Sequence, residues 1–507
     1  MKSKQWIIIT TSLLVVATSW SCNESKLNVE PFGATEQDYF STQDEFQKAV
    51  YGVYAKLSDL YNYNALNFAT PVWYLPGDDI TTSQSNAYEI FGSIQPSDGT
   101  LNYFYTACYQ LIARANVVLE KIREVKPGIY QDENLKKYNY GEALFLRALM
   151  YYYLWNVFGT APLDTVRVTT TDQIYPPSSK GTELLDQAIQ DLGEAAALLP
   201  KQWDAANRGR ATANAAYGLL GKCLVFRATV NKSTADFQAA IQAFDKIDES
   251  VTHLVPNFAD NFSPNAENNA ESLFEFQASQ PYGFDNVWLP NDFDNPVGSM
   301  SAYWGFYSNS FAQFGNAPWI ATNKLLYAFD PGDPRLPLTI DTTKGDVFNH
   351  RAILKYVNPD KLTQSGVGSA NNPRILRYAD VLLLKAEAIL QSGGSTKDAI
   401  DLINEVRTRA RNMSNTGQPA NYNDLITDKN QIMQWIMNER LIELAGEGQR
   451  WWDLRRWALG GIITLNNAYF SSAIPDAMSF QSPKHLNFPI PSSEVDVNPN
   501  IVQNPGY

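Results

Sequence analysis

One stretch near the C-terminus, residues 438–457, constrains the fold of this chain more than any other. Its sequence is NERLIELAGEGQRWWDLRRW. Apolar residues recur at helical spacing before two glycines, Gly446 and Gly448, which can adopt the backbone conformations that end a helix. The pattern therefore predicts a helix, a short turn and a second helix. The stretch is too apolar to lie free in solvent and too charged for an ordinary core.

We interpret the charged residues of this stretch as structural. The aromatic rings are expected to wedge between helices while the arginines pair with nearby carboxylates. The arginines are Arg450, Arg455 and Arg456, and the expected partners are Glu443, Glu447 and Asp453. A ligand-contact role for the stretch is the alternative.

Much of the remaining chain predicts helices that come in pairs. The helical patterns cover residues 44–60, 101–125, 135–157, 182–199, 211–230, 235–248, 377–391 and 396–411. Paired antiparallel helices with small residues at their contacts are typical of tetratricopeptide-like stacking. Long irregular inserts separate these pairs. The sequence therefore predicts an all-α dominated fold, in which a tetratricopeptide-like helix-pair scaffold carries long loop-rich inserts.

The N-terminus predicts export and attachment to a membrane. A short basic start precedes an apolar stretch, residues 6–17, which is too short to span a bilayer as a helix. Small residues and Cys22 follow. This arrangement is typical of a secretory signal, and Cys22 predicts lipidation after cleavage; cleavage without a lipid is the alternative. The predicted organisation is a signal peptide over residues 1–21, a lipidated tether over residues 22–40 and a single domain over residues 41–507.

Composition narrows the function classes. The formal net charge of −13 argues against nucleic acids and polyanionic ligands. The 12 Trp and 27 Tyr exceed what a soluble core requires. Cys108 and Cys223 both lie in helical patterns, which favours two buried free thiols, although the oxidising compartment leaves a disulfide open.

The largest insert, residues 256–368, is where we expect ligand binding, because rigid helices position the loops that make contact. The insert is rich in aromatic residues interleaved with Asn and Asp. Flat rings stack on the apolar C–H faces of sugars, and amide or carboxylate groups bond the hydroxyl edges. The candidate ligand residues here are Trp288, Asp292, Asn295, Tyr303, Trp304, Tyr307 and Trp319. Trp73, in an aromatic and polar stretch before residue 101, is a further candidate ring. A satellite core over the helices is the alternative.

Catalysis finds little support in the sequence. The three histidines are dispersed without metal-ligand spacing, and neither a nucleophile elbow nor a phosphate-binding glycine loop is present. We therefore predict that the protein is not an enzyme. A glycosidase pair stays open, because the separation of two carboxylates is spatial. No cofactor is expected, and a structural calcium ion held by Asp and Asn loops is left open.

Four blocks resemble the SusD/RagB family of outer-membrane nutrient-binding lipoproteins. They cover residues 372–388, 399–410, 439–457 and 489–507. The resemblance implies four tetratricopeptide-like helix pairs that support a variable, loop-rich face. It also implies ligand contacts in the region between the turn near residue 78 and the next helix, where the positional match falls on Asn86 and Tyr88.

The same resemblance implies a function. A lipid-anchored protein of the outer-membrane cell surface would capture an oligosaccharide or polysaccharide and deliver it to a SusC-like TonB-dependent transporter. A RagB-like binder of peptides or other nutrients is the alternative on the same scaffold, and a surface glycosidase is the third possibility.

Overall fold

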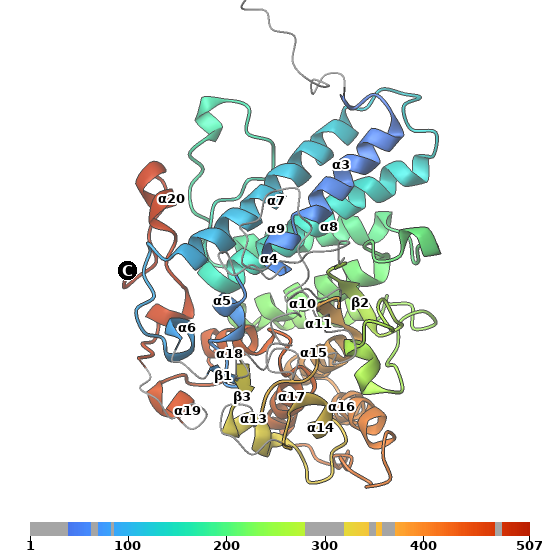
Figure 1. The fold of residues 1–507 in the computed structure, drawn as a ribbon, viewed down its shortest axis with the longest axis vertical. Helices are drawn as coiled ribbons and strands as arrows, with labels where there is room; N and C mark the ends of the chain where they lie inside the picture. Colours follow the sequence, from blue (N-terminus) through green and yellow to red (C-terminus); the bar gives the residue numbers. More distant parts are fainter. Residues whose placement is uncertain are drawn as a thin grey trace, which may run out of the picture.

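The computed structural model describes residues 39–61, 69–82, 86–278, 319–343, 351–356, 371–471 and 479–507. Within these ranges, helices dominate and strands are few (Figure 1). The longer helices are α3 (Gln43–Ala55), α7 (Gly99–Arg123), α8 (Glu133–Phe158), α9 (Glu183–Leu198), α10 (Ala213–Asn231), α11 (Thr234–Phe244), α15 (Tyr378–Gln391), α16 (Thr396–Arg411), α17 (Lys429–Glu443) and α18 (Arg450–Leu459). None of the described helices is both long and apolar enough to cross a membrane.

The helices stack in chain order. Each helix from α7 to α11 packs against the next, α15 packs against α10 and α11, and α16 and α17 pack against α15. Short polar side chains start many of these helices by accepting hydrogen bonds from backbone N–H groups in the first turn. These caps are Asp98 for α7, Asp132 for α8, Thr212 for α10, Ser395 for α16 and Asp428 for α17.

Six of the eight predicted helices agree with the structure to within two residues at each end. The pattern over residues 44–60 is instead divided into α3 and α4 (Ser58–Tyr61), because the N–H groups of Lys56 and Leu57 bond three residues back and tighten the chain there. The pattern over residues 235–248 ends early, at Phe244. The side chain of Asn214 binds both the N–H and the C=O of Asp248 and so removes that residue from the helical ladder.

Short strands connect segments that are distant in the chain. The described strands form two antiparallel pairs. Strand β1 (Ile80–Thr82) pairs with β3 (Trp319–Ala321), and β2 (Ser272–Glu275) pairs with β4 (Arg374–Arg377). The two pairs tie two strands of the large insert to distant parts of the chain: β2 to the strand that leads into α15, and β3 to the strand that precedes α6 (Ala87–Ile90).

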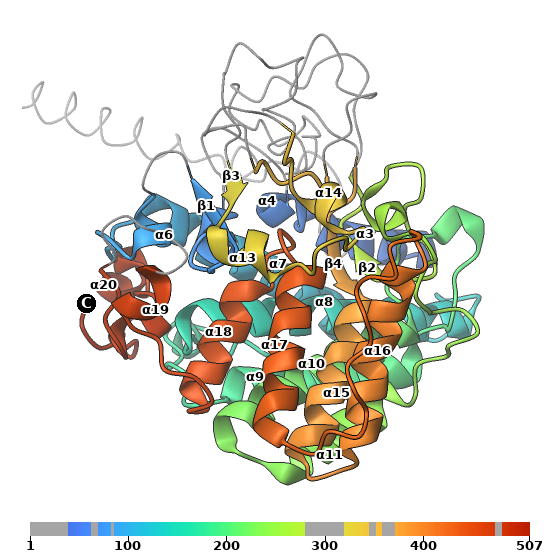
Figure 2. The same cartoon turned by 90° about the horizontal axis from the view of Figure 1, so that it is seen from below.

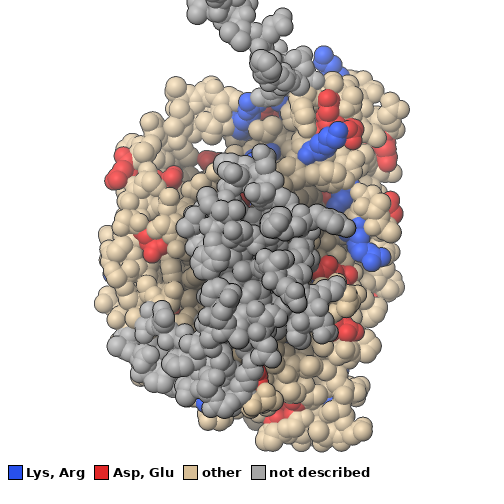
Figure 3. Space-filling model, in the orientation of Figure 1, with Lys and Arg blue, Asp and Glu red and all other residues tan. Residues whose placement is uncertain are grey.

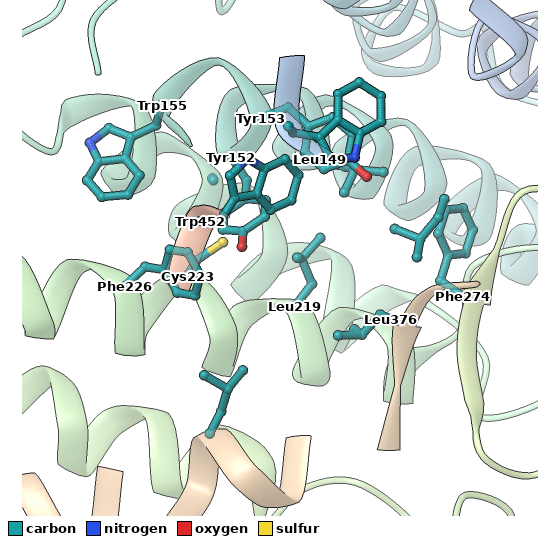
Figure 4. Close-up of a cluster of buried hydrophobic side chains, with 14 of the residues drawn as sticks. Leu149, Tyr152, Tyr153, Trp155, Leu219, Cys223, Phe226, Phe274, Leu376 and Trp452 are labelled. Atoms are coloured by element: carbon teal, nitrogen blue, oxygen red, sulfur yellow. The ribbon is translucent and has the colours of Figure 1, made fainter. Parts of the chain in front are cut away.

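The core between α8, α10 and α18 is aromatic (Figure 4). Trp452 of α18 lies edge-on to Tyr152 and is tilted against Tyr153, with ring centroids 5.3 and 5.0 Å apart. Tyr152 in turn packs edge-on against Phe226 of α10 at 5.2 Å. The prediction that the rings of residues 438–457 wedge between helices is therefore confirmed.

A second part of the core is ionic and centres on Glu443 at the end of α17. Its buried carboxylate accepts hydrogen bonds from Arg335, Arg377 and Arg409, at 2.9, 3.1 and 2.5 Å. We call these four residues the Glu443 cluster. Arg377 also binds Glu271 and Glu447, and Arg335 binds Asp333 and Glu439. The cluster therefore joins α17 to three other segments, the most distant of which, at Arg335, is 108 residues away in sequence.

The predicted pairing of the C-terminal arginines is correct for only one of the three. Arg456 binds Asp453 at 2.9 Å, as predicted, and also Glu387. Arg450 binds Asp78 instead, because the turn at residues 77–79 packs against the start of α18. Arg455 donates to the carbonyl oxygen of Leu486 and the side chain of Asn487, and its guanidinium lies over the ring of Trp155.

Cys108 and Cys223 are both free and buried. Each is fully enclosed within its helix packing, and burial raises the pKa of both thiols. The favoured prediction of two buried thiols is confirmed.

Candidate functional site

The candidate site lies where strand β3 and the residues that follow it, in the large insert, meet the turn at residues 77–79 before β1. The hydroxyl of Thr322 donates to the backbone oxygen of Asp78 at 2.7 Å and caps the helix α13 (Asn323–Ala328) that follows. Thr81 and Thr82 of β1 donate to Glu89 in α6 (Ala87–Ile90). In Figure 2, β1, β3, α4 and α14 (Leu336–Thr339) lie at the opposite end of the scaffold from α11. The two stretches singled out in the sequence thus meet at one end of the molecule.

Two predicted ligand residues, Trp73 and Trp319, belong to the core instead. Trp73 is 2% exposed, and its ring packs against Phe104, with centroids 5.4 Å apart, and against Trp452. Trp319 is buried and stacks on Tyr74 at 5.2 Å. These rings are surrounded by other side chains, so neither presents a free face to a ligand.

Tyr88 and Asn86 have local structural partners. Tyr88 is buried, donates its hydroxyl to Asp98 at 2.8 Å and packs against Phe488. The side chain of Asn86 caps α6 by accepting a hydrogen bond from the N–H of Tyr88 at 2.9 Å. The burial of Tyr88 corrects the prediction of a ligand-contacting ring there. Asn86 remains half-buried, and its role toward a ligand stays a prediction.

Six further candidates lie outside the described residues. They are Trp288, Asp292, Asn295, Tyr303, Trp304 and Tyr307. Their assignment as ligand contacts stays a prediction.

An exposed ring that is not among the residues predicted from the sequence lies at this end of the molecule. Tyr327 in α13 is 75% exposed. Asn323 lies one helical turn before it, on the same side of α13, and the carboxamide oxygen of Asn323 accepts a hydrogen bond from Arg351 at 2.5 Å. An open aromatic face can stack on one surface of a small polar ring, and an amide one helical turn away can bond the edge of that ring. The signal was present in the sequence as Thr322, a helix cap, followed by Asn and Tyr at a spacing of four.

Arg351, whose guanidinium binds Asn323, is held in a strained backbone conformation. Its φ is 81°, outside the range that residues with a Cβ usually adopt. Its N–H donates to the C=O of Asp341 at 2.6 Å, and its C=O accepts from the N–H of Ala321 at 2.8 Å. Strained residues of this kind cluster at ligand clamps and active sites, so the backbone of Arg351 supports a functional role for its side chain.

Charges beneath the site are paired. Asp78 is fully buried and binds Arg450 and Lys324, each at 2.5 Å, and it accepts a hydrogen bond from Tyr469. Burial would raise the pKa of Asp78, but the two cations outweigh it and hold that pKa well below its usual range. On the visible part of the described surface in Figure 3, acidic and basic side chains are interspersed. Within the described ranges, no group of three or more His, Cys, Asp or Glu side chains could hold a metal ion.

Sequence comparisons decide the family. Residues 348–507 match the model described as "SusD family", and residues 29–224 match the model described as "Starch-binding associating with outer membrane". Together these matches span more than half of the chain. The chain belongs to the SusD/RagB family.

Individual SusD-like proteins match over most of their length. The chain is 27% identical to "SusD-like protein P2" of Formosa agariphila, over 98% of this chain and 99% of that protein. It is 26% identical to "Starch-binding protein SusD" of Bacteroides thetaiotaomicron, over 82% of this chain and 80% of that protein. A crystal structure of a SusD homologue from Bacteroides thetaiotaomicron covers 94% of this chain and 99% of its own, with a TM-score of 0.76 and 23% identity. The predicted helix-pair scaffold is thereby confirmed.

Asp78 and Asp79 are two adjacent carboxylates in this SusD-family chain, and a glycosidase also uses a pair of carboxylates. Burial, and then the charge of Asp78, raise the pKa of Asp79 to about 6, whereas the pKa of Asp78 is lowered. Two acids whose pKa values are pushed apart are typical of acid–base pairs. Both side chains are buried, however, and Asp78 is already bound to two cations. This pair therefore has no access to a glycosidic bond.

Proposed function

We propose that the protein is a non-catalytic, cell-surface glycan-binding lipoprotein that captures an oligosaccharide or polysaccharide and delivers it to a SusC-like TonB-dependent transporter. The observation that carries the proposal is the exposed ring of Tyr327, one helical turn from Asn323, whose carboxamide binds Arg351, within the aromatic-rich insert. An aromatic face with hydrogen-bonding groups at its edge is the chemistry that a pyranose ring requires. The words "starch-binding" in the names of one family model and one relative support the same ligand class.

Tyr327→Ala is expected to weaken glycan binding by roughly three- to tenfold, because one stacking contact is lost. The ring is 75% exposed, so the free energy of unfolding should stay within about 0.5 kcal/mol of wild type. Titration calorimetry with an oligosaccharide that wild type binds measures the affinity. Urea denaturation measures the free energy of unfolding.

Tyr51→Ala is the matched control for this experiment. Tyr51 is also an exposed tyrosine, but it lies on α3, at the other end of the molecule from α13 in Figure 1. The control should bind glycan like wild type. Equal affinity of the Tyr327 and Tyr51 variants would remove Tyr327 from the site.

We also propose that residues 1–21 are a signal peptide, that residues 22–40 form a tether with a lipid on Cys22, and that residues 41–507 form one domain. The phrase "associating with outer membrane" in the description of a family model supports the location. Cys22→Ala is expected to release the protein from the outer membrane or leave it in the periplasm, as measured by cell fractionation and protease shaving of intact cells. Wild-type protein found soluble in the periplasm would contradict the anchor.

A further inference from the structure

Two half-buried aromatic rings stack in parallel at the surface of the helical scaffold. Trp435 of α17 lies over Tyr422, in the segment that joins α16 to α17, with ring centroids 4.3 Å apart and 3° between the ring planes. The guanidinium of Arg407 lies over the same tyrosine ring, 4.1 Å from its centroid. Two groups cannot share one ring face at these distances, so Tyr422 is the middle of the stack and Trp435 is its outer member. We call these three residues the Trp435 stack.

The outer ring is available for contact. Among the described residues, no second ring and no cation lies over Trp435. Its indole N–H has no hydrogen-bond partner among these residues and is not buried, so it can donate to a ligand. The carboxamides of Gln431 and Asn438 lie one helical turn before and after it, on the same side of α17. Trp435 is therefore a flat ring with hydrogen-bonding groups along its edge.

The stack is held in place before any ligand arrives. The backbone N–H of Tyr422 donates to the side chain of Asn404 at 2.7 Å, and its C=O accepts from the same side chain at 2.9 Å. Arg407 donates to the C=O of Ala420 at 2.7 Å and pairs with the buried carboxylate of Glu439. A rigid platform loses little conformational freedom when it binds, which favours affinity.

The stack adjoins the helix that carries Tyr327. Helix α13 packs against α17, and Figures 1 and 2 both show these two helices side by side. Asp330, two residues beyond the end of α13, pairs with Arg407 at 2.6 Å. The hydroxyl of Thr416 donates to the C=O of Gly332 at 2.8 Å, so the segment after α16 is also fixed to the segment after α13. The two aromatic positions therefore belong to one continuous part of the surface.

We propose that the Trp435 stack is a second subsite for the glycan that Tyr327 contacts; this inference rests on the proposed function. The open indole face receives the C–H face of a sugar ring, and the indole N–H and the neighbouring carboxamides bond its hydroxyls. The ligand is then a chain that reaches from one ring to the other. Because the rim of Trp435 carries uncharged amides and the protein has a net charge of −13, the chain is a neutral polysaccharide.

Two subsites on one chain bind cooperatively through their linkage. Once a sugar is stacked on one ring, the second ring meets the same chain at a high effective concentration, so the polymer binds more tightly than a short fragment. Tyr327 and Trp435 make no ring contact with each other. The adjacent sugars of a disaccharide therefore cannot stack on both rings at once.

The test compares the full-length wild-type protein with Trp435→Ala by titration calorimetry. The first probe is the polysaccharide that wild type binds most tightly in a panel of soluble neutral glucans, mannans, galactans and xylans. The second probe is the disaccharide unit of that polysaccharide. Trp435→Ala is expected to weaken polysaccharide binding by about tenfold and disaccharide binding by less than about twofold.

A second variant and a control accompany this substitution. Gln431→Ala leaves the stack intact and changes an exposed side chain, so it should fold, and it should weaken polysaccharide binding by about two- to threefold. Trp203→Ala is the matched control. Trp203 is also half-buried, but its N–H donates to the C=O of Ala211 at 2.8 Å, and Arg210 covers its ring at 3.9 Å. The control should bind the polysaccharide like wild type.

Unchanged polysaccharide affinity in both variants would overturn the second subsite and leave the proposed function intact. Equal losses for the polysaccharide and the disaccharide, or an equal loss in the Trp203→Ala control, would do the same. If Trp435→Ala does not fold by circular dichroism, the Gln431→Ala result decides. Failure of wild type to bind any polysaccharide of the panel would instead overturn the proposed function and the inference together.

Discussion

Glu443→Gln is expected to lower the free energy of unfolding by about 3–5 kcal/mol, the typical cost of breaking a buried ion pair. The carboxylate of Glu443 is fully buried and accepts hydrogen bonds from Arg335, Arg377 and Arg409. Glutamine has nearly the same shape but no charge, so the three guanidinium groups would lose the anion they share. Urea denaturation at pH 7 measures the change.

The effect should depend on pH in a defined direction. Burial alone would raise the pKa of Glu443, but Arg409, Arg377, Arg335 and Lys355 outweigh it and lower the pKa to about 2. A carboxyl group with a lowered folded-state pKa stabilises the protein above its unfolded-state value, and this contribution is lost as the pH falls through the folded-state value. The difference between wild type and Glu443→Gln should therefore be full above about pH 5 and shrink from there toward pH 2.

Asp401→Asn is the control for removing a carboxylate. Asp401 pairs with Lys397 four residues earlier in α16, and both side chains are at least half exposed. Its loss should change stability by less than about 0.5 kcal/mol. Equal effects of the two substitutions would show that the Glu443 cluster contributes no more than an ordinary surface pair.

Gly448→Ala is the second substitution with a large expected effect, a destabilisation of about 2–4 kcal/mol. Gly448 has a φ of 73°, and a Cβ there would lie 2.6 Å from Tyr74 and 2.7 Å from Trp73. Both rings are buried, so they have little room to move. The substitution thus combines backbone strain with a clash in the core, which thermal or urea unfolding would measure.

Gly417→Ala separates the two causes. Gly417 has a φ of 72°, but a Cβ there would meet nothing within 4 Å. Only the backbone cost of about 1 kcal/mol should appear. If the Gly448 variant is no less stable than the Gly417 variant, the contact between the turn and the rings of Trp73 and Tyr74 is looser than the structure shows.

The fold could be predicted from the sequence because the patterns that begin and end each helix are local. Helix caps such as Asp98 and Ser395, together with the helical spacing of apolar residues, set the ends of most helices to within two residues. The glycines at the C-terminal turn were also recognisable, and both Gly446 and Gly448 have positive φ values. The errors came where a distant side chain intervenes, as when Asn214 takes the backbone of Asp248 out of a helix.

The site was harder to predict from the sequence, because the exposure of a side chain depends on contacts between distant segments. Trp73 stands in an aromatic and polar stretch that is typical of a ligand platform, yet Gly448 leaves space for its ring in the core. Arg450 has carboxylates close by in sequence, yet its partner is Asp78, 372 residues away. Tyr327 shows the converse: it lies in a short helix whose sequence resembles many others, and only its 75% exposure in the folded chain distinguishes it.

One measurement tests the central claim most directly. The purified protein is titrated against a panel of soluble polysaccharides and oligosaccharides, and new reducing ends are quantified in the same samples. We predict saturable binding to at least one glycan, no new reducing ends, and weaker binding by Tyr327→Ala than by Tyr51→Ala. Binding of peptides but of no glycan would contradict the proposal in favour of a RagB-like binder, and new reducing ends abolished by a single carboxylate substitution would contradict it in favour of a glycosidase.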